Sequence, residues 1–208
     1  MILALDAALS GCSAGIIGMS GVLAEWSGTG GRGEIAALPA MAQAVLLQAG
    51  VMPKQLTSIA VTIGPGSFTG IRAALSLAHG IALAAAIPIV GVTVGEALTV
   101  PDNGRLQWVA VDTRRGRVFL DRGGEVATVA LDALLDPGGP VSVAGDAAEA
   151  VVLRLAARGV DVLLLPGRIP TPAGVAAAAQ RRMATKADDR PAQPLYVDPP
   201  EARPAART

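Results

Sequence analysis

The sequence predicts an α/β fold with mixed sheets, and three observations lead to this class. Short apolar runs of strand length alternate with helical segments after an opening hairpin. A strand leads through a glycine-rich turn into a long Ala/Leu helix at residues 59–86. An apolar run that ends in aspartate occurs once in each half, at Asp6 and at Asp112. This repeat predicts a duplicated architecture, with chance similarity of so short a match as the alternative.

The first half predicts a sheet with two long helices. The expected strands are residues 2–6, 14–19, 22–26, 59–63 and 89–94, of which the second and third form a hairpin. A glycine-rich loop at 28–33 leads into an expected helix at 34–49 that Gly50 ends. That helix has apolar residues on two sides, which predicts two packing partners, namely its own sheet and another chain. The second helix, residues 69–86, stops before Pro88.

A turn cluster at residues 101–104 separates the two halves, so we expect an N-terminal lobe at 1–100 and a C-terminal lobe at 101–208. The expected strands of the second half are residues 108–112, 117–120, 141–144 and 160–165. Asp146 is expected to cap a helix that ends before Gly159. Thr171 and Pro172 are expected to open a last helix, and the Pro-rich tail from Arg190 is expected to be extended.

Composition narrows the classes of function. In 208 residues, 17 Lys and Arg balance 17 Asp and Glu, so no overall field attracts nucleic acid or membrane. Cys12 is the only cysteine, which excludes an internal disulfide and a cysteine-rich zinc site and fits the cytoplasm. Met1 leads directly into an apolar strand without a basic region, so no signal peptide is expected.

Residues 73–95 contain no charged side chain and are long enough to cross a bilayer. His79 and Gly80 lie inside this run, and Pro88 divides it. A buried helix followed by a buried strand explains the run better than a membrane span does, so no membrane association is expected.

The glycine turn is a candidate anion or nucleotide site, because free N–H groups at a helix N-terminus attract negative charge. The Walker A pattern fails, since Ile71 and Arg72 stand where it requires Lys and Ser or Thr. The Rossmann pattern fails at Thr69, which replaces its third glycine. A tight turn that packs the helix close to the sheet is the favoured alternative. The candidate anion contacts are Asp6, Gly64, Gly66, Ser67, Thr69 and Gly70.

No catalytic set and no metal site is expected from the remaining polar residues. His79 is the only histidine and has no evident Ser or Cys partner, so we expect a core or interface role for it. Cys12 has no basic neighbour, which favours a structural thiol. The basic turn of Arg114, Arg115 and Arg117 is either a solvated turn or a contact for an RNA backbone.

Several motifs together resemble the TsaB (YeaZ) family of proteins needed for threonylcarbamoyladenosine in tRNA. The strongest match is GPGSFTGIR at residues 64–72, followed by LAHG at 77–80 and PIVGV at 88–92. The supporting matches are ILALD at 2–6, VDTRRGRV at 111–118 and PLYV at 194–197. These motifs cover both halves of the chain in the family's order.

The resemblance implies a two-lobed, duplicated fold similar to actin and Hsp70 (the ASKHA fold). It also implies a non-catalytic subunit that binds the TsaD-type catalytic subunit, with a TsaE-type ATPase as third component and tRNA as substrate of the complex. A single histidine cannot supply the histidine pair that binds metal in TsaD-like proteins. No intrinsic cofactor is expected, and ATP or ADP is a candidate ligand at the interface between subunits.

In the family, two helices of the N-terminal lobe form the partner interface. Carried over to this sequence, the interface residues are Glu34, Leu38, Met41, Val45, Ile71, Ala74, Ala78, His79 and Ala82. We therefore expect Ala78→Arg to weaken association while the fold survives. The chain departs from the family at Arg32 and Gly33, and in a short segment after Glu96.

Two other functions remain as alternatives, and the oligomeric state is open. An autonomous ATP-binding enzyme of the same fold is one, although the residues after Asp6 lack phosphate-loop glycines. A glycoprotease-like peptidase is the other, although no Ser/His/Asp or metal set supports it. The same two helices are also candidates for a homodimer of the free chain.

Overall fold

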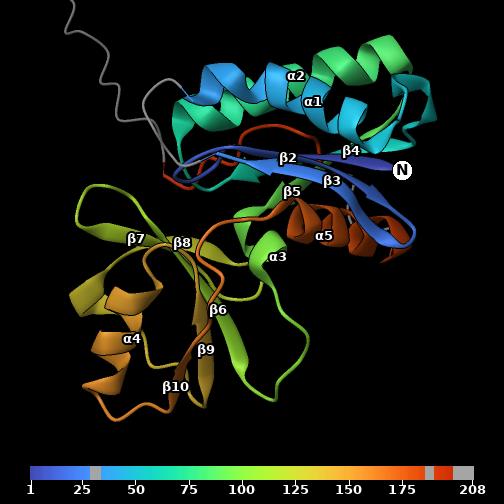
Figure 1. Cartoon of the computed structure of the whole chain (residues 1–208). Helices are drawn as coiled ribbons and strands as arrows, with labels where there is room; N and C mark the ends of the chain where they lie inside the picture. The colour runs from blue at the N-terminus through green and yellow to red at the C-terminus, as the bar shows by residue number, and fades with distance from the viewer. Residues whose placement is uncertain (29–33, 186–189, 199–208) are drawn as a thin grey trace, which may run out of the picture.

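The protein consists of two lobes, each built on a five-stranded mixed sheet (Figure 1). A computed structural model describes residues 1–28, 34–185 and 190–198. The strands of the N-terminal lobe are β1 (Ile2–Asp6), β2 (Ser13–Gly18), β3 (Gly21–Ser27), β4 (Ser58–Gly64) and β5 (Ile89–Thr93). Those of the C-terminal lobe are β6 (Leu106–Asp112), β7 (Arg117–Asp121), β8 (Val126–Ala130), β9 (Val141–Ala144) and β10 (Val162–Leu164).

The two sheets have the same topology. Their strand orders are β3-β2-β1-β4-β5 and, read from the matching edge, β8-β7-β6-β9-β10. In each lobe the first strand pairs antiparallel with the second and parallel with the fourth. The duplication predicted from the repeated run ending in aspartate is therefore confirmed.

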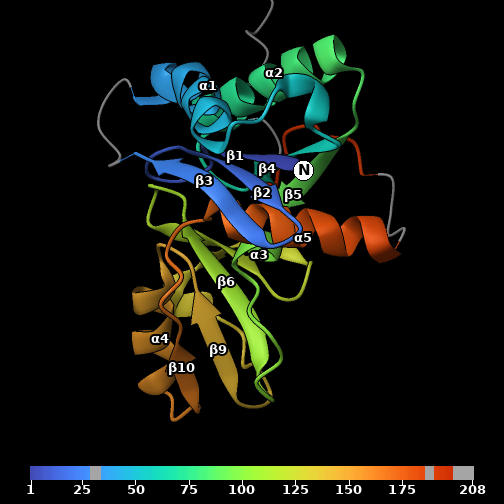
Figure 2. The same cartoon turned by 45° about the vertical axis from the view of Figure 1, so that its right-hand side comes forward.

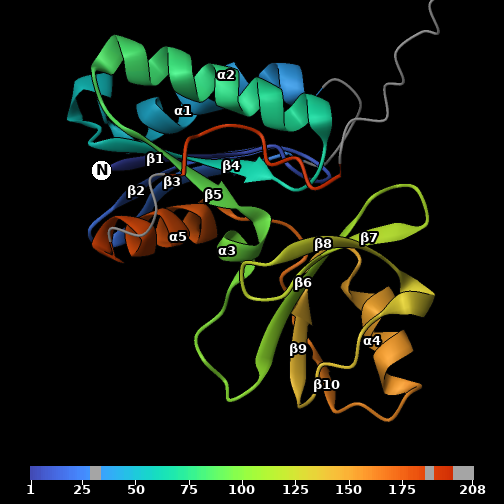
Figure 3. The ribbon, with the colours of Figure 1, turned by 180° about the vertical axis from the view of Figure 1, so that it is seen from behind.

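Helices cover the N-terminal sheet on both faces (Figures 1 and 3). Helices α1 (Leu38–Ala49) and α2 (Phe68–Ala85) lie on one face, and α3 (Val94–Leu98) and α5 (Pro172–Thr185) lie on the other. Leu3 and Leu5 belong to the core under α1 and α2, whereas Ile2 and Ala4 belong to the core under α5. Because both faces are covered, every residue of β1 is buried, which explains a strand that is apolar at successive positions.

The C-terminal sheet has one helix of its own, α4 (Ala148–Ala156), on one face (Figure 2). Trp108, Val118, Leu120 and Val143 pack with Val151 and other residues of that helix. The opposite face turns partly toward the first lobe, since Val109 and Val111 join the core under α1 and α2.

Two predicted helix starts differ from the structure in detail. The expected helix at 34–49 begins with a 3-10 turn at Glu34–Ala37, and the α-helix itself starts at Leu38, with Pro39 in its first turn where no N–H is required. Its end at Gly50 is confirmed by a left-handed φ of 65°. Asp146 does not cap α4, because its Oδ1 accepts a hydrogen bond from the backbone N–H of Asp112 at 2.8 Å. The predicted loop at 28–33 lies, apart from Gly28, outside the described residues.

The expected lobe boundary differs from the structure at the C-terminal end. Helix α5 packs on β1 and β2 of the N-terminal sheet, and Thr171 caps it as predicted by accepting from the Gly174 N–H. Residues 190–198, the strap, then run beside β4 and under α2 (Figure 3). The Leu195 N–H donates to the Ile63 carbonyl at 2.8 Å. The C-terminal lobe is therefore an insertion before α5, and residues 199–208 lie outside the described part.

Glu96 of α3 joins α5 to the strap. Its carboxylate lies 2.9 Å from Arg182 of α5 and 3.1 Å from Arg190. Burial acts to raise the pKa of Glu96, but the hydrogen bonds from the Thr93 N–H and Arg182 outweigh it, so the pKa lies below its ordinary value. The strap is thus anchored where the two lobes meet.

Among the described residues, α2 is the one helix long and apolar enough to cross a membrane by length and composition. In the structure it lies on the N-terminal sheet and buries Ala74, Ala78 and Ala82 there. Core helices pass the same test, so this finding by itself is weak evidence for a membrane span.

Candidate functional site

A cavity of about 1040 Å³ lies between the two lobes. The glycine turn and the start of α2 form one wall of the cavity, and the β6–β7 turn forms the opposite wall. The end of the strap, residues 194–198, closes a third side. Three segments that are distant in sequence therefore meet at this place.

The glycines of the turn serve close packing. A Cβ on Gly66 would lie 2.0 Å from the Ala8 carbonyl oxygen, and one on Gly70 would lie 2.0 Å from that of Ala7. The Ser67 N–H donates to Ala8 O at 2.6 Å, and the Ser67 hydroxyl caps α2 by accepting from the Gly70 N–H. The backbone after β1 thus occupies the space that a side chain at Gly66 or Gly70 would need.

Asp6 is buried beneath this contact. Its Oδ1 accepts hydrogen bonds from the Thr62 hydroxyl at 2.6 Å and from the Ala8 N–H at 3.1 Å. Burial raises the pKa of Asp6 to about 6, against the lowering effect of these two bonds. Of the candidate anion contacts, Asp6, Gly64 and Gly70 are buried, Gly66 and Ser67 are partly exposed at the cavity, and Thr69 is exposed. No cluster of three metal-ligating side chains occurs among the described residues.

The basic turn between β6 and β7 faces the cavity. Arg114 takes a left-handed conformation, and its N–H donates to Asp112 Oδ1 at 2.8 Å. Its guanidinium lies 3.6 Å from Asp112 and 3.9 Å from Asp146, whose pKa is raised by burial. Arg117 lies 3.6 Å from Asp198 of the strap. The structure therefore brings the predicted basic residues to the cavity, each beside an acidic residue or another partner.

Arg72 faces the cavity from α2 and was not among the predicted site residues. Its guanidinium stacks on the Phe68 ring at 3.7 Å from the centroid, and it donates to the Tyr196 hydroxyl at 2.6 Å. Within the part of the chain that the structure describes, no carboxylate lies at ion-pair distance from it. Arg72 closes the GPGSFTGIR motif and Tyr196 lies in PLYV, but only the fold brings these two motifs together.

The residues assigned to a partner interface lie mostly in the chain's own core. Glu34 is half-buried and His79 is exposed, whereas the other seven are at most 6% exposed. Those seven are Leu38, Met41, Val45, Ile71, Ala74, Ala78 and Ala82. They face the sheet because a helix lying on a sheet buries its more apolar stripe against it. At the level of residues the assignment therefore requires correction, and a partner on this layer would contact the outer face instead.

That outer face carries an apolar groove, which we call the helix groove. It has a volume of about 850 Å³ and is lined by Met52, Pro53, Lys54, Ser76, Leu77, Gly80, Ile81, Ala84 and Ala85. Large apolar side chains are exposed on the same layer, with Leu83 at 86% and Leu47 at 75%. An apolar groove with further large apolar side chains exposed on the same layer favours a surface for another protein over a solvated face.

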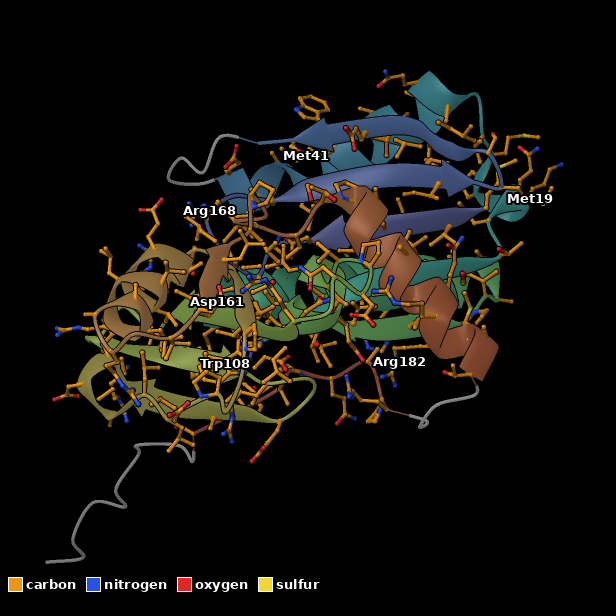
Figure 4. The ribbon with its side chains drawn as sticks, turned by 90° about the horizontal axis from the view of Figure 1, so that it is seen from below. Met19, Met41, Trp108, Asp161, Arg168 and Arg182 are labelled. Carbon is orange, nitrogen blue, oxygen red and sulfur yellow. The ribbon has the colours of Figure 1, made fainter. Side chains whose placement is uncertain are left out.

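The remaining candidates have structural contacts. Cys12 is buried beside Met41 and the Glu34 carbonyl. Burial is the main cause that raises the pKa of its thiol, and the negative charges of Glu34 and Asp6 add to it. The thiol is therefore less reactive than a free cysteine. His79 is exposed rather than in the core, and its Nε2 lies 2.9 Å from the Ala192 carbonyl of the strap. Met19 projects from the tip of the β2–β3 hairpin and is fully exposed (Figure 4).

Comparisons of the sequence and of the fold both match this chain to known proteins. Residues 31–163 match the family described as TsaD, tRNA N6-adenosine threonylcarbamoyltransferase. An uncharacterized protein of Mycobacterium tuberculosis is 32% identical, over 99% of this chain and 95% of its own length. The tRNA threonylcarbamoyladenosine biosynthesis protein TsaB of Escherichia coli is 31% identical, over 57% of this chain and 52% of its own.

Among solved structures, YeaZ from Pseudomonas aeruginosa superposes with a TM-score of 0.74. The superposition covers 94% of this chain and 98% of that one, at 22% sequence identity. This likeness shows that the two-lobed fold is shared.

Proposed function

Because the chain belongs to the TsaD family and, within it, to the TsaB (YeaZ) proteins, we propose that it is a non-catalytic subunit of a threonylcarbamoyltransferase complex. Its partner is a TsaD-type catalytic subunit, and the complex transfers threonylcarbamoyl to adenosine 37 of tRNAs that read ANN codons. A TsaE-type ATPase is the third component, ATP or ADP is a candidate ligand where the subunits meet, and the complex acts in the cytoplasm.

The helix groove is the observation that carries this proposal. Its lining includes the small residues Gly80, Ala84 and Ala85, which allow a helix of the partner to approach closely. Leu47 and Leu83 stand exposed on the same layer, where burial would gain roughly 25 cal/mol for each Å² of apolar surface. The groove and its exposed leucines therefore favour association through apolar surface.

The closed glycine turn supports the non-catalytic part of the proposal. The backbone of Ala7 and Ala8 fills the space beside Gly66 and Gly70, and Asp6 is only 4% exposed. The single histidine cannot form the metal-binding histidine pair of a TsaD-like protein. These features suit a protein that supports a catalytic partner.

The test is the mass of the chain, alone and mixed with a TsaD-type protein at micromolar concentration, with and without ATP. We expect a stable complex for the wild type. Gly80→Arg should weaken it at least a hundredfold, because a charge would be buried in the groove without a partner. A Cβ on Gly80 meets no atom within 4 Å, so this variant should fold normally.

Leu153→Arg is the matched control, since Leu153 is 71% exposed on the outer face of α4. It introduces the same charge in the other lobe and should leave the complex intact. If the wild-type chain forms no complex, the proposal fails. If Gly80→Arg binds as tightly as wild type, the interface lies outside the helix groove. A homodimer of the free chain that also dissociates in Gly80→Arg would show that both partners use one surface.

A further inference from the structure

The interlobe cavity gathers most of the aromatic side chains of this protein. The sequence has two phenylalanines, one tyrosine and two tryptophans. Both phenylalanines, Phe68 and Phe119, and the tyrosine, Tyr196, line the cavity. Phe68 is 59% exposed and Tyr196 is 57% exposed, so both rings are accessible. Aromatic rings left open to solvent in one cavity offer surfaces on which a planar ligand can stack.

Arg72 brings a positive charge to these rings in a fixed position. The Phe68 ring supports one face of its guanidinium, and the Tyr196 hydroxyl accepts one of its hydrogens. Tyr196 is itself placed by the strap, which is bonded to Ile63 of the first lobe and, through Asp198, to Thr128 of the second. The described residues give Arg72 no carboxylate partner, so its remaining donors are available to an anion.

The opposite wall of the cavity carries basic and acidic side chains whose ion pairs a ligand can replace. The ion pairs from Arg114 to Asp112 and Asp146, and from Arg117 to Asp198, are 3.6 to 3.9 Å long. The Arg114 side chain is 70% exposed, and exposed pairs of this length contribute little stability. A phosphate can therefore attract these guanidinium groups, while the carboxylates remain as acceptors for hydroxyl groups.

We propose that the interlobe cavity binds an unpaired nucleotide of single-stranded RNA. In this arrangement a base stacks on Tyr196, Arg72 binds a phosphate, and Asp112 accepts from a ribose hydroxyl. Proteins recognise unpaired RNA by this combination of aromatic stacking, guanidinium contacts and contacts to the 2′-hydroxyl. The inference rests on the proposed function, since it assigns to this chain a contact with the loop of the tRNA substrate.

Single-stranded RNA fits the cavity better than a duplex does. The aromatic rings lie inside a cavity between two lobes, which a base reaches only when it is unstacked. The mixed charge of the β6–β7 wall also disfavours binding by phosphate attraction alone. We therefore expect a preference for looped RNA over duplex RNA, and for RNA over DNA of the same sequence.

The test measures binding of fluorescently labelled nucleic acids to the full chain by anisotropy. The probes are an RNA hairpin with a single-stranded loop, its DNA counterpart, and a blunt RNA duplex of the same charge. We expect the RNA hairpin to bind about tenfold more tightly than the duplex. Arg72→Gln and Tyr196→Ala should each weaken hairpin binding about tenfold.

Arg154→Gln is the matched control, because Arg154 lies exposed on α4 outside the cavity and its loss changes the net charge equally. It should change hairpin binding less than twofold. Equal binding of hairpin and duplex, or equal effects of Arg72→Gln and Arg154→Gln, would overturn the proposal. So would complete displacement of the hairpin by micromolar AMP, which would identify a site for free nucleotides.

These outcomes are separable from those of the proposed function. RNA binding is measured on the chain alone, whereas the proposed function predicts a complex that depends on Gly80. A chain that forms the complex but shows no loop preference would refute only the inference drawn here from the cavity.

Discussion

The two lobes share one topology and differ in what covers their sheets. The N-terminal sheet lies between α1 and α2 on one face and α3 and α5 on the other, whereas the C-terminal sheet has α4 on a single face. Helix α2 has 18 residues and its counterpart α4 has nine. The same strand order thus supports a helix layer with an apolar outer groove in one lobe and a small sheet with an exposed basic turn in the other.

The equivalent aspartates show how environment changes one motif. Asp6 and Asp112 each end the first strand of a lobe and accept from the N–H two residues later, that of Ala8 or Arg114. Asp6 is buried under the glycine turn, and burial raises its pKa to about 6. The Asp112 side chain is 42% exposed and lies beside Arg114 at the cavity. Local hydrogen bonding was duplicated with the strand, whereas burial and charge depend on the neighbouring elements.

The largest expected effect is a loss of stability confined to the N-terminal lobe. Ala78 is fully buried against the sheet, so Ala78→Arg should cost about 5 kcal/mol of unfolding free energy and not merely weaken association. Trp26 reports on the N-terminal lobe and Trp108 on the C-terminal lobe, so fluorescence-monitored denaturation of Trp→Phe variants follows each lobe separately.

Gly80→Arg is the control, because Gly80 lies two positions further along α2 and is exposed, so this variant should unfold like wild type. An Ala78→Arg protein as stable as wild type would mean that Ala78 does not face its own sheet.

The next effect tests whether the lobes use equivalent glycines. Gly66 and Gly145 follow the fourth strand of their lobes with φ of 154° and 104°. An added Cβ would lie 2.0 Å from Ala8 O in one lobe and 2.1 Å from Ala110 O in the other. Gly66→Ala and Gly145→Ala should each destabilise by roughly 4 kcal/mol through backbone strain and displacement. Urea denaturation measures both, with Gly139→Ala, which has open space, as control.

If one of the two variants loses markedly less stability than the other, the two turns occupy corresponding places in the fold but do not contribute equally to its stability.

The smallest expected effect is a change in how the unfolding free energy depends on pH, which we compare between Asp6 and Asp112. The folded-state pKa of Asp6 is about 6, above the ordinary value of 3.8, so its ionisation opposes folding. The stability that the protonated carboxyl provides is fully present below about pH 4 and is lost as the pH rises through about 6. Asp6→Asn should therefore raise the unfolding free energy by up to roughly 3 kcal/mol at pH 8 and change it little at pH 4.

Asp112→Asn is the matched control, because its side chain is nearly half exposed, and it should alter stability by less than about 1 kcal/mol at either pH. Thermal melts across the pH range give both differences. A constant effect of Asp6→Asn from pH 4 to pH 8 would contradict a raised pKa.

Much of the fold could be read from local patterns. Most strands, the first hairpin and the helix that follows the glycine turn could be predicted from apolar runs bounded by glycine and proline, because backbone preferences and strand periodicity are local properties. Strand β8 was not among the expected strands. The cap at Thr171 and the stop at Gly50 were predictable for the same reason. Asp146 could not be assigned, since its hydrogen-bond partner, Asp112, lies on another strand.

Local patterns in the chain were sufficient to predict most of its elements, the duplication of its lobes and, through the motifs, its family. The tertiary structure alone decided which side of each element is open. It turned Ala74 and Ala78 inward and left the helix groove outward, it closed the glycine turn on Ala7 and Ala8, and it joined Arg72 to Tyr196. Burial and contacts between distant segments depend on how elements pack, and no local pattern in the chain encodes them.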